Sequence, residues 1–189
     1  MLTIHASGGM KMMSAATTYN NPKTKLLAVT HLTSSSQEML NNELFINEDI
    51  NVAIKKLAIN AYKSKINGVI CSGLESKMIK ENTSTDFLVV SPGIRYPDSN
   101  SDDQHRICTP KMAKENGCDY IVVGRLITKS TNPLEMYKKV VNDFMGENEK
   151  ITLTEEQAKR FIREFCQGDI WGLYEIQKIL KEEIKLKDI

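Results

Sequence analysis

The chain has 189 residues, of which 41% are hydrophobic and 26% are charged, and its formal net charge is +1. This length allows one domain, or one domain with an appendage, and a charge so close to zero excludes a bulk field that would recruit nucleic acid or an anionic membrane. Widely spaced cysteines without a C-x-x-C pair, the lack of a long apolar run and the lack of a signal-peptide pattern predict a cytoplasmic protein without disulfides, zinc or a membrane span.

Short apolar runs rich in β-branched residues alternate with amphipathic stretches along most of the chain. In chain order the sequence predicts a strand at Leu2–His5, a helix at Met10–Tyr19, a strand at Lys25–Thr30, a helix at Glu48–Lys65, a strand at Gly68–Cys71, a helix at Glu75–Asn82, a strand at Phe87–Ser91, a helix at Thr109–Asn116, a strand at Tyr120–Gly124 and a helix at Pro133–Met145. The strands are almost continuously apolar, which is typical of a parallel sheet covered on both faces. An α/β fold is therefore predicted, either a βα-barrel or a doubly wound sheet.

Polar residues and glycines gather in the loops that follow the predicted strands. These loops are His5–Gly9, Leu32–Ser34, Cys71–Gly73, Pro92–Arg106 and Gly124–Arg125. Polar groups after every strand are typical of a TIM-type barrel, which carries its active site at the carboxyl ends of its strands. A doubly wound sheet usually has a G-x-G-x-x-G run after its first strand, and the sequence contains none. The pattern favours the barrel.

The sequence changes character after residue 146. Thr154–Gln157 has the pattern of a helix start, and a second helix is predicted from Trp171 to Ile184. We therefore predict two parts, a barrel portion over residues 1–146 and a C-terminal helical hairpin over residues 147–189. Periodicity leaves open whether the hairpin covers the barrel, promotes association or does neither, and its balanced lysines and glutamates argue against RNA binding.

The run Val122-Val123-Gly124-Arg125 is the most informative local motif. A glycine at the end of an apolar strand lets the backbone approach a phosphate and offer its N–H, and an arginine offers a planar fork to two phosphate oxygens. An arginine after a strand is also often a surface ion pair, so the motif alone leaves both interpretations open.

Six segments, taken in order, resemble the orotidine 5'-phosphate decarboxylase family, and most closely its bacterial type. They are His5–Gly9, Leu26–Ser34, Gly68–Ser72, Ser91–Arg95, Asp102–Arg106 and Val122–Thr128. The resemblance extends over residues 1–145. It implies a partial TIM-type (β/α)8 barrel with five of the eight βα units, a nucleotide substrate and chemistry that needs no cofactor and no metal.

The resemblance implies binding roles for five residues. Gly124 supplies a backbone N–H and Arg125 a guanidinium to the phosphate, and Gln104 lies in the loop that folds over it. Arg95 adds positive charge from the Pro-Gly-Ile-Arg turn, and Thr33 meets the pyrimidine ring. Thr33 also suits a helix cap, because the surrounding Leu-Thr-Ser-Ser-Ser run has cap chemistry.

The family's catalytic groups are not found among these residues. They are a first-strand aspartate, a second-strand lysine and a D-x-K-x-x-D signature on the third strand, which the resemblance places upstream of Met1, and no such signature occurs downstream. In the family the lysine of that signature stabilises and protonates the ring carbanion left when carbon dioxide departs, and its last aspartate comes from a partner subunit. We therefore predict an enzyme of pyrimidine nucleotide biosynthesis by family, without a catalytic residue in this chain and without turnover by this chain alone.

Three interpretations stay open. In the first, the chain is one part of a decarboxylase whose remainder is encoded separately or lost through a late start codon. In the second, it is a non-catalytic remnant that binds nucleotide phosphate. In the third, it is another phosphate-binding βα-barrel enzyme. The predicted partners are orotidine 5'-phosphate or uridine 5'-monophosphate (UMP), together with a second copy of the chain or a complementing N-terminal fragment. Neither nucleic acid nor a membrane is expected as a partner.

Overall fold

The computed structural model describes residues 1–97 and 106–146. The chain divides into two compact units, residues 1–121 and residues 122–189. The predicted boundary at residue 146 falls within the second unit, at the end of the described residues, and the predicted helical hairpin over residues 147–189 lies outside them.

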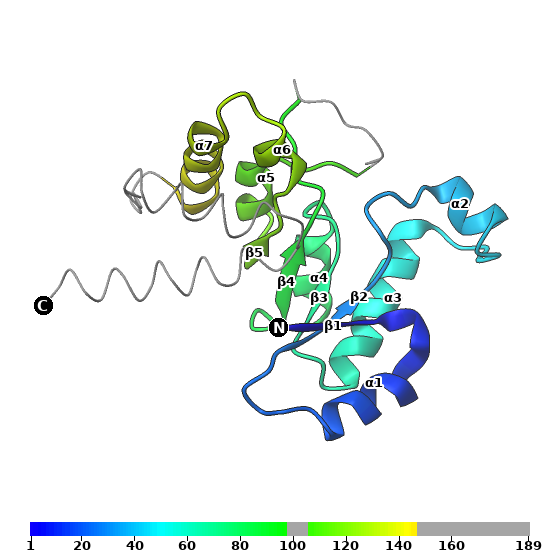
Figure 1. Ribbon diagram of the computed structural model, residues 1–189. Coiled ribbons are helices and arrows are strands. Elements are labelled where there is room, and N and C mark those ends of the chain that lie inside the picture. The colour runs from blue at the N-terminus through cyan, green and yellow to red at the C-terminus, as the bar shows by residue number, and fades with distance from the viewer. Residues whose placement is uncertain (98–105, 147–189) are drawn as a thin grey trace, which may run out of the picture. The chain divides into compact units, whose positions relative to one another are not determined.

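The first unit is built on a five-stranded parallel sheet in which strand order follows chain order (Figure 1). Its strands are β1 (Leu2–His5), β2 (Leu26–Val29), β3 (Gly68–Ile70), β4 (Leu88–Ser91) and β5 (Tyr120–Ile121). The register places Ala28, Val69 and Val89 side by side across three strands, and all three are fully buried. In β2, β3 and β4, burial on both faces explains the almost continuous apolar sequence, whereas most of β1 is exposed.

Helices connect successive strands of the sheet. They are the 3-10 turn η1 (Ala6–Gly8) and the helices α1 (Gly9–Thr18), α2 (Gln37–Asn42), α3 (Ile50–Lys63), α4 (Ser76–Asn82) and α5 (Pro110–Glu115). Polar caps fix several of their starts: the Asp49 carboxylate accepts from two backbone N–H groups of α3, and the Thr109 hydroxyl accepts from Met112 N at the start of α5. The helix boundaries therefore follow from local side-chain chemistry.

The order of strands and helices decides between the two predicted folds. A doubly wound sheet reverses its strand order at a switch point, whereas this order, β1-β2-β3-β4-β5, has no reversal. Helix α3 contacts both α1 and α4, so the connecting helices are neighbours, as they are on the outside of a barrel (Figure 1). The prediction of a partial barrel is confirmed.

One glycine sets the spacing between β3 and β4. A Cβ atom at Gly68 would lie 2.2 Å from the Leu88 carbonyl oxygen and 2.8 Å from its carbonyl carbon. These are backbone atoms of the paired strand, so they cannot turn aside. Only glycine fits at this point of the sheet.

The second unit is described over residues 122–146. It contains a short helix, α6 (Arg125–Thr128), and a longer one, α7 (Pro133–Met145), which contact each other. The predicted helix over Pro133–Met145 is confirmed, and the Asn132 side chain caps it by accepting from Glu135 N at 3.3 Å.

The structure corrects the prediction at three elements. The strand expected over Tyr120–Gly124 ends at Ile121, and Gly124 instead caps the unpredicted helix α6. Helix α2 was also missed; its Ser36 cap accepts from Met39 N at 3.1 Å. Both missed helices are short, so they carry too little periodicity to stand out from loop sequence.

Candidate functional site

Polar loops follow β2, β3 and β4 at the same edge of the sheet, because parallel strands end on the same side. The loop after β2 contains His31, Leu32 and Thr33, and the loop after β3 contains Ser72 and Glu75. The loop after β4 contains Arg95. Most of these groups are buried: Thr33, Ser72, Glu75 and Arg95 are each no more than 6% exposed. Buried polar groups need partners, and one arginine supplies several of them.

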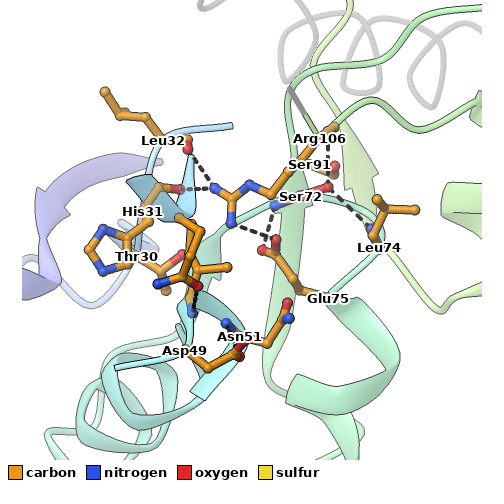
Figure 2. A network of polar contacts seen from close by, with 12 residues as sticks. Thr30, His31, Leu32, Asp49, Asn51, Ser72, Leu74, Glu75, Ser91 and Arg106 are labelled. Carbon is orange, nitrogen blue, oxygen red and sulfur yellow. Dashed lines mark hydrogen bonds and ion pairs between the residues drawn. The ribbon is translucent and has the colours of Figure 1, made fainter. Parts of the chain in front are cut away.

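Arg106 lies at the centre of this polar cluster (Figure 2). Its Nη1 donates to Glu75 Oε1 at 2.9 Å, and its Nη2 donates to the carbonyl of His31 at 3.3 Å and to that of Leu32. Its backbone N–H donates to the carbonyl of Thr33 at 3.3 Å, and its own carbonyl accepts from Ser72 Oγ at 3.2 Å. Arg106 thereby joins the loops that follow β2 and β3.

The Glu75 carboxylate is the buried anion of the cluster. Besides Arg106 it accepts from the backbone N–H of Ser72 at 2.9 Å, which closes the turn that leads into α4. Burial raises the pKa of Glu75 to about 7, although Arg106 and the Ser72 N–H act in the opposite direction. The side chain of Glu75 therefore gains or loses its proton near neutral pH.

His31 lies in the loop after β2. Its ring is partly buried, and its Nε2 has no hydrogen-bond partner in the described structure. Burial lowers the pKa of His31, and the charge of Arg106 lowers it further. The imidazole is therefore neutral at physiological pH, and the cluster gains no second cation from it.

The backbone of residues 106–108 also binds the turn that holds Arg95. Arg95 N donates to the Cys108 carbonyl at 3.0 Å, and Cys108 N donates to the carbonyl of Gly93 at 3.4 Å. Gly93 has a φ of 75°, a conformation that favours glycine. The Arg95 side chain is 6% exposed, and its Nη1 donates to the carbonyl of Ile94 at 2.7 Å. The turn is therefore fixed in two ways: by main-chain hydrogen bonds to Cys108, and by the hydrogen bond from the Arg95 side chain to the Ile94 carbonyl.

The structure brings two of the predicted binding residues to one segment. Thr33 and Arg95 both lie in the first unit, and each is tied to residues 106–108 by a main-chain hydrogen bond. The alternative interpretation of Thr33 as a helix cap is wrong, because Ser36 caps α2. Gln104 and the neighbouring Asp102–Asp103 pair lie outside the described residues.

Gly124 and Arg125 belong to the second unit. Gly124 is exposed, and a Cβ atom there would meet nothing within 4 Å. Its carbonyl accepts from Ile127 N at 2.9 Å, which starts α6, and Arg125 is the first residue of that helix. The predicted pair thus stands at the start of a helical turn and not at the end of a strand, but its backbone remains open for the close approach of a ligand.

The structure also bears on metal and thiol chemistry. Within residues 1–97 and 106–146 no cluster of three metal-ligating side chains exists, and no helix of this part is long and apolar enough to cross a membrane. Cys71, Cys108 and Cys118 are free and buried, and burial raises the pKa of the Cys108 thiol to about 11.

A comparison with protein families identifies the group to which this architecture belongs. Residues 1–140 match the model of the orotidine 5'-phosphate decarboxylase / HUMPS family. The chain belongs to this family.

Curated orotidine 5'-phosphate decarboxylases resemble the chain closely in sequence. The protein of that name from Staphylococcus saprophyticus is 46% identical over 149 residues, which cover 77% of this chain and 65% of the relative. One from Staphylococcus aureus is 45% identical over 148 residues and is covered to 64%. The chain therefore spans less than two thirds of the length of these relatives.

Solved structures support the same assignment. The crystal structure of orotidine 5'-phosphate decarboxylase from Lactobacillus acidophilus aligns with a TM-score of 0.63 at 40% identity, covering 76% of this chain and 62% of that one. An uncharacterized conserved protein from Geobacillus kaustophilus aligns with a TM-score of 0.60 at 32% identity, covering 76% of this chain and 63% of that one.

Sequence reasoning missed the two residues at the centre of this polar cluster. Arg106 was noticed only as the end of the Asp102–Arg106 segment, and Glu75 only as the start of a helix. A buried carboxylate and a guanidinium 31 residues apart leave no local pattern. The signal that could have found them was the position of each in a loop after a strand.

Proposed function

We propose that this chain carries the nucleotide-binding part of an orotidine 5'-phosphate decarboxylase, the enzyme that converts orotidine 5'-phosphate to UMP. The match of residues 1–140 to the family model carries this proposal. The polar edge of the first unit supports it, because Thr33 and Arg95 lie in fixed, buried loops at the ends of β2 and β4, where a barrel enzyme of this family binds its substrate.

Different residues bind different parts of the substrate. Gly124 N–H and the Arg125 guanidinium bind the phosphate, Gln104 closes over it and Arg95 adds positive charge. Thr33 contacts the pyrimidine ring. A phosphate held by a bidentate guanidinium and neutral donors is bound strongly and with direction, and this remote binding energy helps to close the site around the reacting ring.

The lysine that stabilises and protonates the ring carbanion must come from outside these 189 residues, since they contain no D-x-K-x-x-D run. We propose that a second polypeptide completes the site, either an N-terminal fragment with that signature or a chain within a dimer. We propose that the protein acts in the cytoplasm, because the free, buried cysteines of the described part suit a reducing compartment.

Ligand binding by the purified 189-residue chain tests the proposal. UMP should bind weakly, and uridine, which lacks the phosphate, should bind less well still. Arg125→Ala should weaken UMP binding by at least about tenfold, because a charge-assisted hydrogen bond is lost. Titrations followed by protein NMR at millimolar ligand would measure these affinities.

Lys139→Ala is the matched control, since it removes an exposed cation from α7 of the same unit. It should bind UMP as the wild type does. Equal binding of UMP by the wild type and Arg125→Ala would show that the predicted phosphate grip is not formed.

A further inference from the structure

Arg106 has no assigned role in substrate binding, yet it makes polar contacts with the loops that follow β2 and β3. Its side chain and backbone reach the carbonyls of three consecutive residues, His31, Leu32 and Thr33. The guanidinium donates to the carbonyls of His31 and Leu32 (Figure 2), and the main-chain N–H donates to that of Thr33. One residue therefore fixes the path of the whole loop that carries Thr33.

Glu75 holds the guanidinium in place from the opposite side. Its side chain is 3% exposed and that of Arg106 is 13% exposed, so both charges have left most of their water. A buried ion pair of this kind contributes little net stability, because desolvation offsets the attraction. The ion pair instead fixes the positions of the Glu75 carboxylate and the Arg106 guanidinium.

We infer that Arg106, held by Glu75, is a positioning residue that fixes Thr33 for contact with the pyrimidine ring. This inference rests on the proposed function, in which Thr33 meets the ring and Arg125 binds the phosphate. Loss of Arg106 should therefore weaken recognition of the ring and leave recognition of the phosphate unchanged.

Two ligands separate these effects in the full 189-residue chain. UMP carries phosphate and ring, whereas ribose 5-phosphate carries the phosphate without the ring, so the ratio of their affinities reports the ring contact. The wild type should prefer UMP. Arg106→Met should reduce that preference by up to about tenfold, the usual worth of a hydrogen bond, while its affinity for ribose 5-phosphate stays at the wild-type value.

A second variant guards against misfolding. Arg106→Met leaves the Glu75 carboxylate buried without its cation, so the double variant Glu75→Gln/Arg106→Met, which removes both charges, should fold and show the same reduced preference. Thr33→Val should reduce the preference too, and its combination with Arg106→Met should be no worse than the stronger single change, because both act through one contact.

Lys80→Met is the matched control. Lys80 also forms a partly buried ion pair in the first unit, to Asp119 at 2.8 Å, and its side chain is 15% exposed. Asp119 also accepts from Val89 N near the start of β4, so this pair lies at the amino-terminal ends of the strands, away from the polar loops. Lys80→Met should lower the unfolding midpoint but leave the preference for UMP intact.

The outcomes separate the inference from the proposed function. Wild-type chain that binds neither ligand would contradict the proposed function and, with it, the role of Arg106. Wild-type chain that binds ribose 5-phosphate would keep the phosphate grip, and an unchanged preference for UMP in Arg106→Met would then overturn the inference alone. Equal losses for both ligands in both Arg106 variants would also overturn it, since they would indicate a general structural role.

Discussion

At the scale of single residues, the polar edge of the sheet is organised by one ion pair. Glu75 and Arg106 bring together a turn after β3 and a loop after β2, and besides their contact with each other their side chains bind backbone atoms of these loops. The same burial that makes these contacts directional also disfavours the charged form of Glu75. Such a group links the stability of the fold to pH.

The stability of the chain should fall as the pH rises through the range in which Glu75 ionises. The pKa of Glu75 is about 7 in the folded protein against an ordinary value of 4.5, so between these values the folded state holds a proton that the unfolded state has released. The contribution is fully present below pH 4.5 and is lost as the pH passes 7. A shift of this size corresponds to on the order of 3 kcal/mol.

Urea unfolding at pH 5, 6, 7 and 8 would measure this dependence. Glu75→Gln should flatten it, because the amide does not titrate. Glu135→Gln, which removes an exposed carboxylate paired with Lys138, should keep the wild-type slope. Parallel curves for the wild type and Glu75→Gln would show that Glu75 titrates at its ordinary pKa in the folded chain.

At the scale of elements, local sequence was sufficient for the strands and the longer helices. Apolar runs found all five strands, and β1 and α7 match their predicted bounds. The error at β5 arose because Val122 and Val123 continue the apolar run, although they leave the sheet. Among the polar loops, the family resemblance named Thr33 and Arg95 as candidate binding residues, and their roles stay predictions. The pairing of Glu75 with Arg106 depends on how distant loops meet in space, which no local pattern encodes.

The contact between β3 and β4 should not tolerate a side chain at Gly68. Gly68→Ala places a methyl group against the Leu88 backbone and should lower the free energy of unfolding by roughly 1–3 kcal/mol, the usual cost of overpacking. Gly8→Ala is the matched control, because its Cβ would meet only the flexible side chain of Met12. Urea midpoints would compare the two variants, and equal stability would show that the strands move apart at little cost.

At the scale of the whole molecule, the chain is a portion of a larger family fold. It spans less than two thirds of its curated relatives, and within the described residues β1 pairs with β2 alone and β5 with β4 alone. Edge strands offer unpaired N–H and C=O groups to a further strand. The complementing polypeptide that we propose would join the sheet at such an edge and supply the lysine at the same time.

The 189-residue polypeptide alone should not decarboxylate orotidine 5'-phosphate, because it contains no D-x-K-x-x-D run to supply the lysine beside the leaving carboxylate. Adding an N-terminal fragment that carries this signature should restore turnover, followed as the loss of substrate absorbance, and light scattering should show the two polypeptides in one complex. The same fragment with its signature lysine changed to alanine should bind without restoring turnover. Arg125→Ala in this chain should lower the restored kcat/KM, because the phosphate grip helps to close the site. A substantial rate from the chain alone would contradict the division of the site between two polypeptides.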